Sequence, residues 1–125
     1  MNRKLGTSIV WSCCAAERFA SFFWLAGASG FTSGLANFAS KVSLSMFDAL
    51  EQWNYTKAME LQALVSEFEF QREGRGTASN VPVIKALMNC IGFKGGDCRP
   101  PIHPLSRVEE ELAIQGGTDW GLVRL

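Results

Sequence analysis

The spacing of apolar residues changes at about residue 39 of this 125-residue chain. Residues 7–14 are a short, partly β-branched run without polar alternation, which is typical of a strand buried on both faces of a parallel sheet. Residues 30–34 form a second short run. Between the two, residues 16–26 have a helical pattern that ends at Gly27. This order predicts a βαβ unit with two parallel strands.

The remaining residues predict helices alone, over residues 40–53, 55–70, 80–91 and 106–115. The second helix should bury one face formed by Ala58, Leu61, Leu64, Val65 and Phe68. Asn54 is the expected cap of that helix, and Ser79 or Asn80 is the expected cap of the third. Ser106 and Glu109 have the spacing of a capping box. We expect a βαβ part (residues 1–39), a helical part (residues 40–115) and a loose tail (residues 116–125).

Composition narrows the class of protein. Hydrophobic residues make up 47% of the chain, which is enough for a core, and 12 basic residues balance 12 acidic ones. Without a basic stripe, nucleic acid is not expected as a partner. Residues 5–16 resemble a signal peptide, but Glu17 and Arg18 interrupt the run before the ~20 residues of a membrane span. We therefore read it as a buried strand and expect a cytoplasmic protein that does not bind a membrane.

The cysteines indicate no metal chemistry. There are four of them, none in a C-x-x-C pair, at Cys13, Cys14, Cys90 and Cys98. The only histidine, His103, lies between prolines and is expected to be a loop residue. We expect free thiols, no metal site and no cofactor.

Three segments carry a family resemblance: residues 16–39, 80–92 and 99–106. In this order and spacing, they resemble the end of the dihydrodipicolinate synthase and N-acetylneuraminate lyase superfamily. The resemblance implies an α/β fold, the C-terminal portion of a (β/α)8 TIM barrel with a helical extension, predominantly helical in this piece. Residues 9–14 would be strand seven and residues 31–34 strand eight.

The resemblance also implies a site. Barrel active sites lie at the carboxyl ends of strands. Thr32 and Ser33 match the eighth-strand position that lines the keto-acid pocket, and Asn37 follows in the loop, so these three are the candidate substrate-binding residues. The Thr-Ser pair resembles the branch that dehydrates keto-deoxy sugar acids. Ala15 and Ala16 stand where synthases carry Gly-Asp.

Several residues in and near these segments could instead have a purely structural role. Gly30 and Gly34 would then only permit close packing, and Asn37 would order a turn. Glu17 and Arg18 are expected to be a solvated helix start. Lys85 falls inside a helix, where we expect it to be solvated or paired with a carboxylate.

The family's lyases and dehydratases act on 2-keto acids through a Schiff base to a lysine on strand six. None of the lysines here ends a predicted strand, namely Lys4, Lys41, Lys57, Lys85 and Lys94. The only tyrosine, Tyr55, falls in the helical extension rather than at the family's proton-shuttling position. We therefore expect a lyase fragment that is inactive alone, from a family that is often homotetrameric. The alternative is a non-catalytic helical module that binds a partner.

Overall fold

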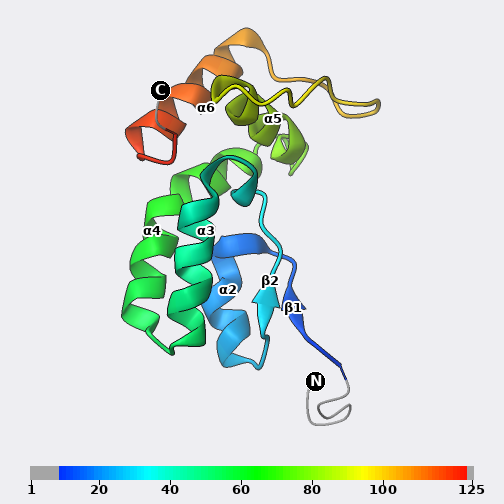
Figure 1. The fold of residues 1–125 in the computed structure, drawn as a ribbon. Helices are drawn as coiled ribbons and strands as arrows, with labels where there is room; N and C mark the ends of the chain where they lie inside the picture. Colours follow the sequence, from blue (N-terminus) through cyan, green and yellow to red (C-terminus); the bar gives the residue numbers. More distant parts are fainter. Residues whose placement is uncertain (1–8, 124–125) are drawn as a thin grey trace.

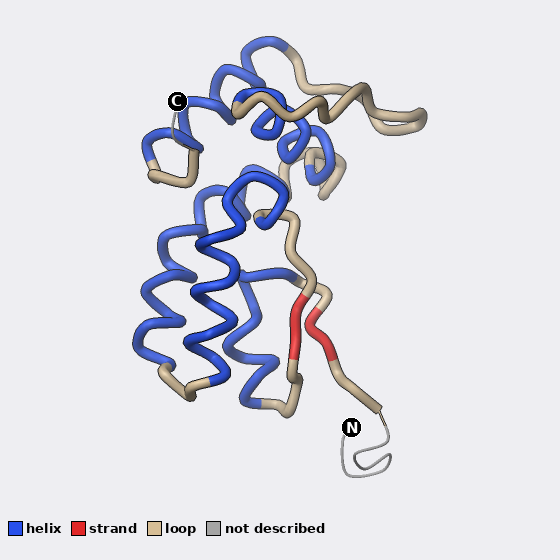
Figure 2. The backbone as a smooth tube through the Cα atoms, in the orientation of Figure 1, coloured by secondary structure: helices blue, strands red, loops and turns tan. Residues whose placement is uncertain are grey.

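The computed structural model describes residues 9–123, which contain two short strands and five helices. In chain order these are β1 (Ser12–Cys13), α2 (Ala16–Leu25), β2 (Gly30–Phe31), α3 (Ala36–Glu51), α4 (Tyr55–Arg72), α5 (Asn80–Cys90) and α6 (Arg107–Asp119) (Figures 1 and 2). None of these helices is long and apolar enough to cross a membrane.

The predicted βαβ unit is confirmed, with shorter strands than the sequence indicated. β1 pairs with β2 in parallel, Ser12 opposite Gly30 and Cys13 opposite Phe31, and α2 connects them. The two strands lie side by side (Figure 2). Ile9 and Val10 precede the paired region and are exposed, so the expectation of a strand buried on both faces is wrong for them. Residues 7 and 8 of the predicted strand lie outside the described residues.

Helices α2, α3 and α4 lie side by side and share an apolar cluster (Figure 1). The buried members of the cluster are Ala20, Trp24, Met46, Ala49, Leu50, Ala58 and Leu61. The inward face predicted for α4 is correct for Ala58, Leu61, Val65 and Phe68 and wrong for Leu64, which is exposed. Leu64 therefore lies at the edge of the apolar stripe, where helical spacing alone cannot separate core from surface.

Helices α5 and α6 lie beyond the end toward which the strands point (Figure 1). They pack on α3 and α4 through a second cluster that includes Leu35, Val65, Phe68, Val83 and Leu87. The expectation of a loose tail is wrong for the described part of it, because α6 continues to Asp119 and Leu122 and Val123 are buried. Gly117 lies close to α5: a Cβ there would lie 2.7 Å from Leu87 Cδ2, so a larger residue would force the Leu87 side chain to move.

Local signals place most helix ends. Asn54 Oδ1 accepts the Lys57 N–H at 3.1 Å, and Ser106 and Glu109 form the predicted capping box. Gly27 ends α2 with a left-handed φ of 98°. Ser79 precedes α5 without a capping hydrogen bond from its side chain. Helix α3 begins at Ala36, earlier than predicted, and is kinked at Ala39 (φ −132°, ψ 49°), so the expected start at residue 40 marks the kink.

Candidate substrate-binding site

The three candidate residues lie together in the segment that follows β2. Thr32 continues directly from the strand, and its N–H donates to the Cys13 carbonyl at 2.9 Å. Its side chain is exposed, with Oγ1 3.5 Å from the same carbonyl. Asn37 lies in the first turn of α3 and is also exposed. Its Nδ2 donates to the Gly34 carbonyl at 2.9 Å, so Asn37 orders the turn locally. The placement at the carboxyl end of the second strand agrees with the sequence analysis.

The Ser33 hydroxyl faces the protein interior. Ser33 Oγ accepts the Ala36 N–H at 2.8 Å at the start of α3 and lies 2.7 Å from Ser43 Oγ. It also donates to the Glu17 carboxylate. These partners occupy the hydroxyl, because one O–H group donates one hydrogen bond. Thr32 is thus the member of the Thr-Ser pair whose side chain reaches solvent.

Glu17 is a buried acid at the centre of this arrangement. Its side chain is completely buried, and Oε1 accepts hydrogen bonds from Ser33 and Ser43. The other oxygen, Oε2, is buried without a hydrogen-bond partner among the described residues. The expectation of a solvated helix start is therefore wrong for Glu17. The first turn of α2 lies beneath the loop after β2 and beside α3, so a residue that looks like a surface charge is inside.

Arg18 differs from Glu17 because it stays partly exposed. It forms an ion pair with Glu73 at the end of α4. Its guanidinium carbon lies 5.2 Å from the ring centroid of Phe19 and 5.1 Å from that of Phe70. Arg18 therefore holds α2 against α4 through charge and aromatic contact, rather than being a freely solvated residue.

A second ion pair, formed by two residues of α4, lies next to the loop after β2. Arg72 NH1 donates to Glu69 Oε1 at 2.7 Å, and both side chains are largely buried. Burial raises the pKa of Glu69, the nearby Arg72 opposes that rise, and the negative charge of Glu17 adds to it. A Cβ on Gly34 would lie only 3.0 Å from Arg72 Cζ and 2.6 Å from Ile84 Cδ1. Close packing is therefore a sufficient reason for glycine at position 34.

A pocket of about 210 Å³ opens beside this ion pair, at the carboxyl end of β1. It is lined by Cys14, Ala15, Ala16, Arg18, Phe19, Glu69, Arg72, Glu73, Thr77 and Asn80. Arg72 also donates from Nε to Asn80 Oδ1 at 2.8 Å, which ties the end of α4 to the start of α5. Sequence reasoning missed Glu69 and Arg72, because charged residues near a helix end normally indicate a solvated surface.

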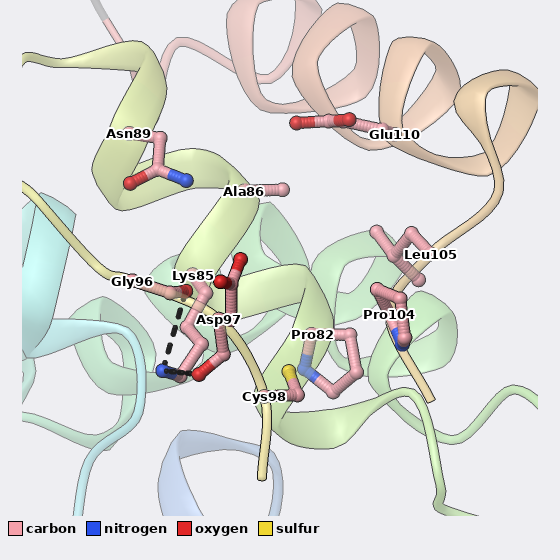
Figure 3. A pocket seen from close by; sticks show the side chains of 10 residues that line it. All are labelled: Pro82, Lys85, Ala86, Asn89, Gly96, Asp97, Cys98, Pro104, Leu105 and Glu110. Atoms are coloured by element: carbon pink, nitrogen blue, oxygen red, sulfur yellow. Dashed lines mark hydrogen bonds between the residues drawn. The ribbon is translucent and has the colours of Figure 1, made fainter. Parts of the chain in front are cut away.

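Lys85 is held in a different pocket, between α5 and the segment that follows it (Figure 3). Its ammonium group donates to the carbonyls of Gly95 at 2.7 Å, Asp97 at 2.8 Å and Gly96 at 3.4 Å. The expectation of a solvated or carboxylate-paired lysine is therefore wrong, because backbone carbonyls bind it. The pocket has a volume of about 160 Å³ and includes Asn89, Cys98 and Glu110 in its lining.

Comparison with known proteins identifies the family. The sequence of residues 1–115 matches the protein family described as the Dihydrodipicolinate synthetase family. The chain belongs to this family. A curated relative, 4-hydroxy-tetrahydrodipicolinate synthase from Lactobacillus helveticus, is 29% identical over 91 residues, which are 73% of this chain and 28% of the relative.

Solved structures confirm the predicted fold class. Dihydrodipicolinate synthase from Bacillus clausii is 34% identical, with a TM-score of 0.84 over 90% of this chain and 38% of that one. A variant of 2-keto-3-deoxygluconate aldolase from Sulfolobus solfataricus is 19% identical, with a TM-score of 0.74 over 98% and 43% of the two chains. The chain thus spans about a third of the length of its relatives, and its mostly helical fold corresponds to part of a synthase-like barrel.

Proposed function

We infer that the chain supplies one side of the substrate pocket of a lyase that acts on 2-keto acids through a Schiff base. The observation that carries this proposal is the loop after β2, which presents Thr32 and Asn37 at the carboxyl end of a strand in a family member. Barrel enzymes build their active sites at that end. In this arrangement Thr32 binds the keto acid with its hydroxyl. Ser33 holds the loop from behind through Glu17 and Ser43.

The Schiff-base lysine comes from outside this chain. Such a lysine needs a deprotonated amine at the barrel mouth. Lys41 and Lys57 lie on α3 and α4, exposed, and Lys94 is exposed in the segment after α5. Lys85 is bound by three carbonyls. Lys4 lies outside the described residues and precedes the first strand by fewer residues than the crossover that must follow a sixth strand. We therefore propose that the chain is inactive alone and becomes part of an active site only with the barrel strand that carries the lysine.

Two sequence features around the loop support a proposal for the class of keto acid. Thr32 adds a hydroxyl where synthases usually have an aliphatic side chain, and Ala15 and Ala16 replace their Gly-Asp pair. An exposed hydroxyl suits a substrate with hydroxyl groups of its own. We propose a keto-deoxy sugar acid as the substrate, in a cytoplasmic homo-oligomer of the kind common in the family.

The second candidate function is a non-catalytic helical interaction module. The observation that favours it is the outer face of α6, where Val108 and Leu112 lie one turn apart and are both about two-thirds exposed (65% and 60%). Exposed apolar pairs of this kind suit a partner helix. The module hypothesis requires no keto acid to bind.

Borohydride trapping separates the two hypotheses. The 125-residue chain alone, incubated with pyruvate and sodium borohydride, is expected to show no mass increase. A chimera that fuses the preceding part of the Bacillus clausii synthase to this chain is expected to gain one reduced pyruvate adduct. Thr32→Val should raise the keto-deoxy sugar acid concentration needed for half-maximal trapping, whereas Thr56→Val, a control on the exposed start of α4, should not. The proposal would be refuted by an adduct on the chain alone. It would also be refuted if Thr32→Val left the concentration for half-maximal trapping in the chimera unchanged.

A further inference from the structure

A cavity of about 200 Å³ lies where the carboxyl end of α4 packs against α5 and α6 (Figure 1). Most of its surface is apolar, and Val83, Leu105 and Leu112 contribute to it. The other residues that line it are Gln71, Gly74, Arg75, Ser79 and Glu109. We call it the α6 cavity. An apolar cavity with a few polar groups is the usual composition of a small-molecule site.

The α6 cavity is separate from the pocket at the carboxyl end of β1. The loop of residues 73–79, between α4 and α5, contributes to both. Gly74 and Ser79 line the α6 cavity, whereas Glu73 and Thr77 line the pocket beside β1. None of the residues that line the α6 cavity belongs to the proposed keto-acid site. A molecule bound there is therefore not the substrate.

Ser79 offers the α6 cavity a hydroxyl that the start of α5 does not use. Ser79 is 4% exposed, and its side chain makes no capping hydrogen bond. Its Oγ lies next to Gly74, where an added Cβ would be only 3.2 Å away. Because glycine has no side chain, the hydroxyl stays open to the cavity. A buried hydroxyl favours a ligand that forms a hydrogen bond with it, since leaving such a group unpaired costs free energy.

The two charged residues of the α6 cavity are paired with each other. Arg75 Nε donates to Glu109 Oε1 at 2.9 Å, and Arg75 Nη2 donates to Oε2 of the same carboxylate. Arg75 Nη1 donates to the carbonyl of Pro104 at 3.3 Å. A bidentate pair of this kind uses the donors and acceptors that an ionic ligand would need. The cavity therefore favours a neutral ligand.

We propose that the α6 cavity binds a compact neutral molecule with one apolar ring and one hydroxyl group, of the size of phenol. The ring packs on Val83, Leu105 and Leu112, and the hydroxyl bonds with Ser79 Oγ. The volume suits one ring with a substituent, because an apolar cavity of about 150 Å³ holds benzene. A rigid ring also loses less conformational entropy on binding than a flexible chain of the same size.

The test titrates phenol, and separately toluene, into the ¹⁵N-labelled 125-residue chain and follows the amide chemical shifts. The two probes have nearly the same shape, and only phenol carries a hydroxyl. Both should shift amides selectively within residues 71–83 and 105–112. Ser79→Ala should weaken phenol binding by at least about threefold, the loss of one net hydrogen bond, and should leave toluene binding within about twofold of the parent.

A pair of variants on α6 adds a second measurement. Leu112→Ala removes part of the apolar wall and should weaken binding of both probes. Val108→Ala, on the same helix and similarly exposed (65% against 60% for Leu112), does not alter the lining and should change neither. Circular dichroism of each variant verifies folding. Because Leu112 is exposed, its variant keeps the test decisive even if Ser79→Ala does not fold.

The proposal is overturned if about 10 mM phenol shifts no amide in these two ranges, or if the shifts spread evenly over the chain. Equal weakening of phenol and toluene by Ser79→Ala would also overturn it. So would amide shifts near Leu112 that depend on protein concentration and do not respond to phenol, because a second copy of the chain would then fill the cavity. Keto-acid trapping by the chimera is a separate measurement, so this proposal and the proposed function fail independently.

Discussion

Removing the Ser43 hydroxyl tests whether the buried Glu17 carboxylate holds the loop after β2. Ser43 is buried, and its hydroxyl donates to Glu17 and contacts Ser33. A hydrogen bond to a charged group contributes about 1.5–3 kcal/mol, because its loss leaves a buried charge less solvated. Among residues 9–123, Glu17 has only these two hydroxyl donors, both on one of its oxygens. Ser43→Ala should therefore lower the free energy of unfolding by about 1.5–3 kcal/mol, a large share of the ~5–15 kcal/mol typical of a domain.

Urea unfolding followed by circular dichroism and tryptophan fluorescence measures this effect. Ser45→Ala, at an exposed position on the same helix, is the matched control and should change stability by less than about 0.5 kcal/mol. In a Glu17→Gln background the charge is gone, so Ser43→Ala should cost only the ~0.5–1.5 kcal/mol of a neutral hydrogen bond. The reasoning is wrong if Ser43→Ala matches the control, or if its cost is the same in both backgrounds.

Three further predictions concern the caps and the ion pairs. Ser106→Ala removes the capping box of α6 and should lower the free energy of unfolding, measured in urea, by about 1 kcal/mol. A variant as stable as the parent protein would contradict the assigned cap. Hydrogen bonds from Ser106 and from Arg75 lower the pKa of Glu109 to about 2. The stability that Glu109 provides should therefore be present above its ordinary pKa of 4.5 and be lost as the pH falls toward 2, and Arg75→Met should flatten that part of the pH–stability curve. Burial raises the pKa of Glu69, so the folded state loses stability as the pH rises from the ordinary value of 4.5 through that raised pKa. Glu69→Gln keeps an acceptor for Arg72 and does not ionise, so its stability relative to the parent protein should increase as the pH rises above 4.5. A stability difference between the two proteins that does not vary with pH would contradict the raised pKa of Glu69.

Helix positions could be predicted because their signals are local. Asn54, Gly27 and the Ser106 capping box act within a few residues of chain, so the sequence alone indicates where α2, α4 and α6 begin or end. Strand length could not be predicted in the same way. A strand extends only as far as its neighbours pair with it, and β1 has one neighbour among the described residues.

The candidate site was predictable in position and not in orientation. Thr32 and Asn37 lie just after β2, at its carboxyl end, as expected, and their role in binding substrate stays a prediction. The inward turn of Ser33 depends on Glu17, 16 residues earlier, and Ser43, 10 residues later. Pattern reasoning reads Glu17 as a solvated helix start because acidic residues are common there. Only the packing of the loop after β2 and of α3 against it shows that it is buried.

The most direct test of the central claim is a crystal structure of the chimera with a keto-deoxy sugar acid trapped by borohydride. We expect a reduced Schiff base on a lysine outside these 125 residues, with the bound acid in hydrogen-bond reach of the Thr32 hydroxyl. We also expect the Ser33 hydroxyl to stay bonded to Glu17 beneath the loop. A trapped acid that makes no contact with residues 32–37, or one attached to a lysine of this chain, would contradict the account.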